Sequence, residues 1–327
     1  MWSFIEPINL IRYLCVWRVN RALVRLPAYL PGELAAVLGA IIAERLPTKQ
    51  AQVWQNALVQ PASQGRWPVE TVLFAYPGKQ YYGPGEPILW ELKLLGPQAD
   101  HTFFLEVILP AMEAASHTTD PRWYQSNTVW GRFDIQAVYV ARGSQWEPLV
   151  SDGRLDTRYR VEPMQWAEGL SFAPPPEVTR SHKTLNWLTP VDLRPPPTPF
   201  GSLNTPPIEA EPAQADPEIP IPTLQLLLEA LLVRIAQLMP GKDTTPGDVW
   251  QRLSPDEQAA LWDAVIKADQ INLRQVKSAI APSGWPGGWL GEQSFGAMPA
   301  SLLPYLELGS ILHLGRQTHL GCGTFVI

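Results

Sequence analysis

The C-terminal stretch 302–327 constrains the fold of this chain more than any other, because it combines a helical pattern, a glycine-bearing turn and a β-prone end. Leucines and isoleucines recur near helical spacing from Leu302 to Leu312, and Pro304 falls in the first turn, where its missing N–H is harmless. The turn follows, and the chain closes on the β-prone segment 324–327. The stretch therefore predicts a helix, a turn and a strand in that order.

The turn, residues 313–323, has the composition of an anion-binding loop. Gly315, Gly321 and Gly323 permit positive φ angles and allow backbone N–H groups to approach a ligand with no Cβ in the way. Successive N–H groups in such a turn form a concavity that binds anions, and Arg316 adds a positive charge beside it. Phosphate is the ligand that this combination favours. The spacing differs from the G-x-x-x-x-G-K-[ST] loop, and a dinucleotide fingerprint precedes a helix rather than following one.

In its context, this stretch resembles the C-terminal glycine-rich loop of the RAMP superfamily of CRISPR-associated proteins. Within that superfamily it is most similar to the precursor-crRNA processing endoribonucleases of the "Cas six" type. The segments that carry the resemblance are 287–292, 305–315 and 320–323, with 26–34 near the start of the chain. The resemblance covers nearly the whole chain and implies an α+β fold of two tandem ferredoxin-like (RRM-like, βαββαβ) domains. The alternative interpretation of the same residues is a surface turn that caps a core helix.

Length and composition agree with a two-domain protein of the cell interior. The chain has 327 residues, of which 46% are hydrophobic, and this supports a large core in about two domains. Two cysteines, Cys15 and Cys322, cannot form a disulfide framework, so a reducing cytoplasm is the expected location. The N-terminus lacks the basic start of a signal peptide, and no apolar run is long enough to span a bilayer. No membrane partner is expected.

The charge distribution is uneven. A formal net charge of −6 counts against a general nucleic-acid binder, whose usual sign is a basic surface. Cations nevertheless outnumber acids in residues 1–60, where they are Arg12, Arg18, Arg21, Arg25, Arg45 and Lys49. We therefore expect a local basic surface and only modest non-specific affinity for RNA.

Residues 1–180 are predicted to form the N-terminal ferredoxin-like domain. Period-two alternation, turn signals and helical spacing predict a strand within 8–28, a helix from about 31 to 45, strands at 69–76 and 87–95, a helix from about 102 to 115, and a strand at 133–140. Pro110 is expected to perturb the second helix. Segment 127–132 is interpreted as a degenerate counterpart of the terminal turn, which makes Arg132 a candidate RNA contact.

Residues 181–327 are predicted to form the C-terminal domain. Prolines punctuate 174–222, and about 196–221 is interpreted as an extended linker or insertion. The remaining pattern predicts a strand within 181–193, helices at 223–239 and 246–268 with a fresh start at Ser254, and strands near 272–280 and 289–295. The terminal helix, turn and strand complete a second βαββαβ unit with an extra helix.

The resemblance also implies a chemistry. The 2′-hydroxyl of the RNA attacks the adjacent phosphate without a metal ion or cofactor and leaves a 2′,3′-cyclic phosphate and a 5′-hydroxyl. Such a reaction needs a base, an acid and cations near the phosphorane. Histidine usually supplies the base in this family, from the first helix or just after it, but residues 29–60 contain none and Ala40 stands at about that place.

The candidate catalytic residues are therefore Tyr29, Arg45 and Lys49, together with His319 in the terminal turn as an acid or a phosphate contact. Each has an ordinary alternative: core packing for Tyr29, a solvated helix end for Arg45 and Lys49, and a solvent-facing loop position for His319. His313, His319 and Cys322 match no zinc spacing, so no metal site is predicted.

The candidate RNA-binding residues are Gly315, Arg316, Gln317, Thr318, Gly321, Gly323 and Arg132. The leading hypothesis is an endoribonuclease that binds CRISPR repeat RNA and processes precursor crRNA. The rival is a non-catalytic crRNA-binding subunit that contacts other subunits of a CRISPR effector complex. A two-domain interaction module with no RNA ligand is the third hypothesis, which the acidic charge supports.

Overall fold

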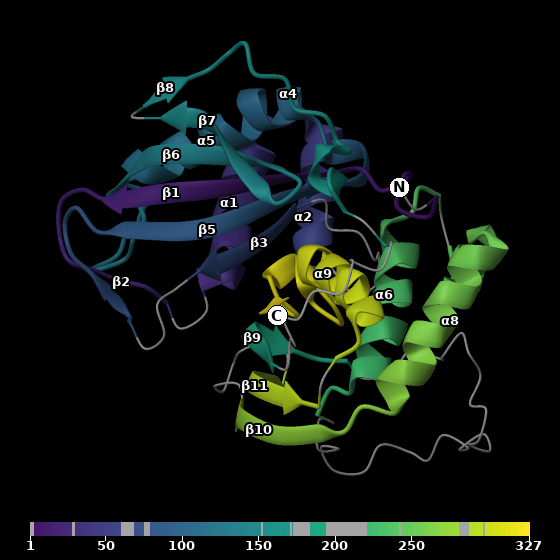
Figure 1. Cartoon of the computed structure of the whole chain (residues 1–327). Coiled ribbons are helices and arrows are strands. Elements are labelled where there is room, and N and C mark those ends of the chain that lie inside the picture. The colour runs from purple at the N-terminus through teal and green to yellow at the C-terminus, as the bar shows by residue number, and fades with distance from the viewer. Residues whose placement is uncertain are drawn as a thin grey trace. The chain divides into compact units, whose positions relative to one another are not determined.

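The chain divides into two units in a computed structural model, shown in Figure 1. The N-terminal unit comprises Ile8–Leu170 with His319–Gly321, and the C-terminal unit comprises Met1–Pro7, Ser171–Thr318 and Cys322–Ile327. The structure describes residues 3–27, 30–59, 69–74, 79–151, 153–170, 172, 184–193, 221–241, 244–280, 288–296 and 298–327. The predicted boundary near residue 180 lies outside these residues, as does the predicted linker 196–221 except for Ile221.

An antiparallel sheet with the strand order β3-β5-β1-β6-β7-β8 organises the N-terminal unit. Its strands are β1 (Leu10–Val19), β3 (Val69–Phe74), β5 (Pro87–Leu95), β6 (Phe133–Arg142), β7 (Gln145–Ser151) and β8 (Arg154–Leu155). With α1 (Leu30–Arg45) between β1 and β3 and a helical segment between β5 and β6, the chain order is βαββαβ. The sheet order β3-β5-β1-β6 is that of a ferredoxin-like domain, as predicted. Strands β7 and β8 extend this sheet and were not predicted.

The two faces of β1 differ in chemistry. One face enters the hydrophobic core through Ile11, Tyr13, Cys15, Trp17 and Val19. On the other face, Nε of Arg12 donates to Oε1 of Glu91 at 2.6 Å, and Nζ of Lys93 lies 3.9 Å from the same oxygen. Glu91 and Lys93 are buried, so their charges are stabilised by each other and by Arg12 instead of by hydration.

The helix expected at 102–115 is present but interrupted. It consists of α4 (His101–Phe103), a π-helical segment (Phe104–Ile108) and α5 (Leu109–His117). The N–H of Leu109 bonds to the carbonyl of Phe104, one residue further back than in an α-helix. Because Pro110 has no N–H and its ring clashes with the carbonyl four residues earlier, the wider turn accommodates it. The perturbation predicted at Pro110 is confirmed.

A helix that the sequence analysis did not predict, α2 (Thr48–Val59), follows α1 after a short connection. The N–H of Ala51 bonds to the carbonyl of Pro47, and Trp54 is buried with its ring 5.8 Å from that of Phe103. A second, two-stranded sheet pairs β2 (Val24–Arg25) with β4 (Tyr81–Tyr82).

The C-terminal unit is a second ferredoxin-like domain. Its antiparallel sheet has the order β10-β11-β9-β12, formed by β9 (Thr184–Val191), β10 (Leu273–Ile280), β11 (Trp289–Phe295) and β12 (Phe325–Val326). Helices α6 (Leu224–Leu238), α7 (Pro246–Arg252) and α8 (Pro255–Asp269) separate β9 from β10, and α9 (Leu303–Leu312) separates β11 from β12. The predicted elements of this half are confirmed within a few residues.

The fresh helix start predicted at Ser254 is also confirmed. Ser254 and Glu257 form a capping box, in which each side chain accepts from the backbone N–H of the other. Glu257 also accepts from the backbone N–H of Ser3 at 3.2 Å, which ties the first residues of the chain to this unit. Within the described ranges, no helix has both the length and the apolar character needed to cross a membrane.

Candidate nucleic-acid interface

The terminal turn begins where α9 ends, and a buried arginine stabilises that end. Nε of Arg234, on α6, donates to the carbonyl of Leu312 at 2.9 Å, so a cation meets the negative end of the α9 dipole. His313 follows with φ 61° and is fully buried. The cation at this helix end is therefore supplied by Arg234, from a distant part of the sequence.

Backbone hydrogen bonds close the turn and attach it to the end of β9. The N–H of Leu314 donates to the carbonyl of Gly323 at 3.1 Å. The N–H of Gly323 in turn donates to the carbonyl of Pro190 at 2.9 Å, and the N–H of Arg316 donates to that of Asp192 at 3.0 Å. These bonds attach the two ends of the turn to the C-terminal sheet.

Two of its glycines are required by the protein's own backbone. Gly315 and Gly323 have φ angles of 95° and 77°, in the left-handed region. A Cβ on Gly315 would lie 2.4 Å from the carbonyl oxygen of Asp192, and one on Gly323 would lie 1.8 Å from that of Leu314. Glycine therefore permits the close packing of the turn against β9, whatever ligand the turn binds.

The tip of the turn is its exposed part. Arg316 and Gln317 are exposed, and Gln317 has a φ of 60°, whereas Thr318 is buried and His319 is partly buried. In the described part of the chain, Arg316 makes no ion pair. A guanidinium displayed on a rigid turn without a carboxylate partner is available to a phosphate.

Arg45 and Lys49 lie on either side of the connection between α1 and α2. Arg45 is the last residue of α1, where a cation is favoured by the helix dipole, and Lys49 lies in the first turn of α2, where it is not. Both are exposed, and neither forms an ion pair with any residue that the structure describes. The helix dipole therefore explains Arg45 but not Lys49. Tyr29 lies outside the described residues.

Arg132 belongs to a hydrogen-bonded loop of the N-terminal unit. Its Nη1 donates to the carbonyls of Gln125 and Thr128 at 3.0 and 2.9 Å, and its guanidinium lies 4.7 Å from the ring centroid of Tyr124. The structure brings Arg132 into one unit with Arg45 and Lys49, while Arg316 lies in the other.

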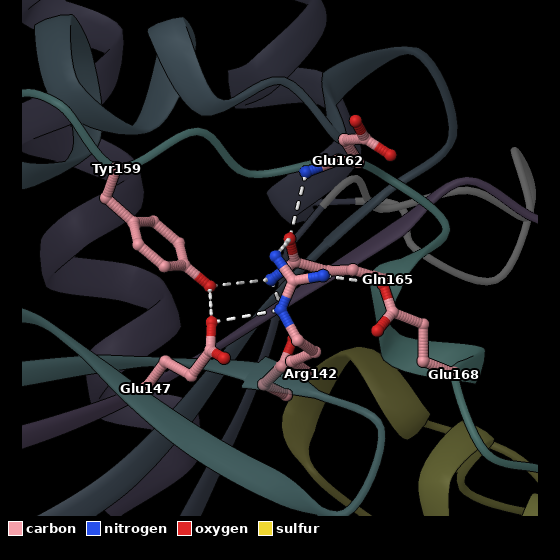
Figure 2. A network of polar contacts seen from close by, with 7 residues as sticks. Arg142, Glu147, Tyr159, Glu162, Gln165 and Glu168 are labelled. Atoms are coloured by element: carbon pink, nitrogen blue, oxygen red, sulfur yellow. Dashed lines mark hydrogen bonds and ion pairs between the residues drawn. The ribbon is translucent and has the colours of Figure 1, made fainter.

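A dense polar network in the N-terminal unit has a structural role (Figure 2). Arg142 at the end of β6 donates to Glu147 of β7 at 3.0 Å and to Glu168 at 2.7 Å, and Tyr159 also donates to Glu147. Buried Gln165 donates to the carbonyl of Ala141 at 2.9 Å. The bonds from Tyr159 and Arg142 lower the pKa of Glu147. These contacts hold the β6–β7 turn against segment 159–168.

The histidines do not form a catalytic cluster in the residues that the structure describes. His101 accepts or donates at 3.1 Å with the hydroxyl of Tyr13, and its burial lowers its pKa, so it is neutral at pH 7. His117 ends α5, and His182 lies outside the described residues. Within the same residues, no group of three His, Cys, Asp or Glu side chains is placed to hold a metal ion.

A solved structure that aligns with a TM-score above 0.5 supports the fold, and other solved structures are similar at lower scores. A structure described as a partial Cas6-RT-Cas1--Cas2 complex aligns with 98% of this chain and 46% of its own, at 10% identity and a TM-score of 0.52. One described as a Cas6 product complex aligns with 97% of this chain and 99% of its own, at 16% identity and a TM-score of 0.49. One described as a RAMP protein binding different RNA substrates aligns with 96% and 98%, at 10% identity and a TM-score of 0.40.

Comparison with sequence families is more specific. No curated protein matches the chain. The family described as CRISPR-associated endoribonuclease Cas6 matches residues 185–325, from the start of β9 to β12, and this range includes the whole terminal turn. The match confirms the resemblance in the C-terminal stretch: residues 185–325 of this chain are similar to the Cas6 family of CRISPR-associated endoribonucleases.

Proposed function

We propose that this protein binds CRISPR repeat RNA and cleaves precursor crRNA by attack of a ribose 2′-hydroxyl, without a metal ion. The observation that carries the proposal is the match of residues 185–325 to an endoribonuclease family. That range includes the terminal turn, on which Arg316 is exposed and forms no ion pair with the described residues, and such a guanidinium suits a phosphate ligand. The fold shared with a Cas6-containing complex agrees with this function.

The reaction defines what the side chains must do. The 2′-oxygen forms a bond to the adjacent phosphorus as the bond from phosphorus to the 5′-oxygen breaks. A base takes the 2′-hydroxyl proton, an acid protonates the leaving oxygen, and cations stabilise the dianionic phosphorane. We assign the cationic role to Arg45 and Lys49, which are exposed and have no carboxylate partner among the described residues. Tyr29 is assigned to the same set.

His319 is proposed as a phosphate contact or the acid. It follows the exposed tip of the terminal turn and is partly buried. The exposed positions Arg316 and Gln317 offer side-chain donors to an RNA phosphate beside it, and Thr318, which is buried, is proposed as part of the same contact. Gly315, Gly321 and Gly323 set the backbone path. Arg132 is proposed as an additional RNA contact in the N-terminal unit.

The second candidate is a non-catalytic subunit that holds a crRNA end. The specific observation in its favour is that α1 and α2 carry no histidine, although the family usually places its base there. Such a subunit would contact other CRISPR proteins, as the Cas6 part of the Cas6-RT-Cas1--Cas2 complex does. Both candidates place the protein with RNA in the cytoplasm.

One incubation separates these functions. End-labelled repeat RNA is mixed with an excess of the full chain in EDTA, and both binding and product ends are measured. The nuclease predicts cleavage with a 2′,3′-cyclic phosphate on the upstream product. Tight binding with no cleavage supports the non-catalytic subunit, and absence of binding contradicts both.

A further inference from the structure

A small sheet in the N-terminal unit presents an arginine and a tyrosine to solvent. Val24 of β2 and Tyr82 of β4 pair with each other and are buried, so the next pair, Arg25 and Tyr81, lies on the opposite, exposed face. Tyr81 is 50% exposed, and the Arg25 guanidinium lies 5.7 Å from its ring centroid. Figure 1 shows β2 on the side of the N-terminal unit where β1 ends.

The loop that contains Arg132 presents a second pair of the same kind. Tyr124 is 41% exposed beside the Arg132 guanidinium. The hydrogen bonds from Arg132 to two loop carbonyls fix the cation, and Gly131, with φ 73°, leaves room for the ring. A Cβ on Gly131 would lie 2.9 Å from Cδ2 of Tyr124 and 2.3 Å from the carbonyl oxygen of Thr118. The tyrosine is thus held in place before any ligand arrives.

Backbone hydrogen bonds join the two pairs into one surface. The N–H of Arg25 donates to the carbonyl of Asn127 at 2.7 Å, on the side of β2 opposite to β4. The N–H of Leu26 donates towards β4, to the carbonyl of Gln80 at 2.8 Å. Strand β2 therefore lies between β4 and the loop. We call the surface formed by Arg25, Tyr81, Tyr124 and Arg132, with Arg21 in the preceding turn, the tyrosine–arginine surface.

This surface is positive in an acidic protein. The chain has a net charge of −6, yet no ion pair within the described ranges involves Arg21, Arg25 or Arg132. Three acids of the flanking segments are already engaged: Glu86 pairs with Lys79 at 2.8 Å, Asp134 accepts from the amide of Asn20 at 2.9 Å, and Glu33 accepts from the indole N–H of Trp130. The arginines thus remain available to an anionic ligand.

We propose that the tyrosine–arginine surface binds a single-stranded segment of RNA, with bases stacked on Tyr81 and Tyr124 and phosphates contacted by Arg21, Arg25 and Arg132. Exposed aromatic rings flanked by cations bind unpaired bases, because every base has a face that can stack and every nucleotide brings a phosphate. A duplex keeps its bases stacked on each other and cannot use the tyrosines. The proposal rests on the proposed function and names a part of the RNA that the terminal turn need not contact.

The test measures binding of the full chain to a fluorescein-labelled oligouridylate of about twelve nucleotides by anisotropy. The Tyr81→Ala/Tyr124→Ala double variant should bind at least about tenfold more weakly than the wild type, because each lost stacking contact weakens binding substantially. The Tyr81→Phe/Tyr124→Phe variant keeps both rings and should bind within about twofold of the wild type.

Salt dependence tests the arginines separately. Arg25→Ala should reduce the slope of log affinity against log salt concentration by about 0.7, the value for one phosphate contact on a single strand. Arg154→Ala is the matched control, because Arg154 is also exposed and without an ion pair in the described chain but lies on β8. It should leave the slope unchanged.

The outcomes distinguish this proposal from the proposed function. Equal oligouridylate affinity in the wild type and the double alanine variant overturns the tyrosine–arginine surface, as does a wild type that does not bind the oligouridylate. Neither result bears on whether the protein cuts repeat RNA, because cleavage is measured separately. If the double variant loses oligouridylate binding while the wild type fails to cut repeat RNA, the surface stands and the nuclease assignment fails.

Discussion

Replacing Gly323 by alanine should destabilise the C-terminal unit strongly. The new Cβ would lie 1.8 Å from the carbonyl oxygen of Leu314, and φ at this position is 77°. The left-handed conformation costs an alanine about 1–2 kcal/mol. Relief of the overlap requires a backbone shift that breaks the hydrogen bonds between Leu314 and Gly323 and between Gly323 and Pro190. At roughly 1 kcal/mol each, their loss brings the total to about 3–4 kcal/mol.

Thermal unfolding followed by circular dichroism measures this effect. A loss of 3–4 kcal/mol corresponds to a fall of about 10 °C in the apparent melting temperature of a unit of this size. Gly153→Ala is the control, since Gly153 has a similar φ of 72° but no atom lies within 4 Å of its Cβ position. It should show the conformational cost alone, about 1–2 kcal/mol. An equal effect of the two substitutions would refute the argument that the turn needs glycine for close packing.

The other predictions concern charged groups. Although burial raises the pKa of Glu91, the charges of Arg12 and Lys93 lower it below 4.5 overall. The stability that this shift contributes is therefore present above about pH 4.5 and lost as the pH falls through the folded pKa. Arg12→Met should remove the larger part of it, since Lys93 remains, and should cost about 3–5 kcal/mol in urea unfolding at pH 7. Arg45→Ala or Lys49→Ala should slow single-turnover cleavage of repeat RNA about a hundredfold, because a cation aimed at the phosphorane contributes on the order of 3 kcal/mol. His319→Ala should weaken RNA binding modestly and leave the rate at saturating protein nearly unchanged; loss of the rate instead would identify His319 as the acid or base.

The sequence predicted the elements whose signals are local. The helix cap at Ser254, the first-turn proline Pro304, the alternation along β1 and the turn signals around β5 all depend on neighbouring residues. The structure has these elements within a few residues of the predicted bounds. The order of these elements was enough to predict two ferredoxin-like units, because βαββαβ has one common sheet order.

Features that depend on distant residues were missed. Strand β7 contains Pro148, which argues against a strand until its pairing with Tyr139 next to a bulge in the β6–β7 register is known. The cap on α9 comes from Arg234, on α6, and no local pattern indicates it. Tyr81 and Tyr124 appear as a pair of exposed rings only after β2 has brought their segments together. The sequence could therefore predict the terminal turn of the candidate site but not the exposed rings of Tyr81 and Tyr124.

The most direct test of the central claim is cleavage of a repeat RNA that carries a single deoxyribose at the cut site, measured in EDTA beside the all-ribose RNA. The account predicts that the protein binds both RNAs equally, cuts only the all-ribose one and leaves a 2′,3′-cyclic phosphate. Cleavage of the deoxyribose-containing RNA at the same bond, or loss of all cleavage in EDTA with restoration by a divalent cation, would contradict it.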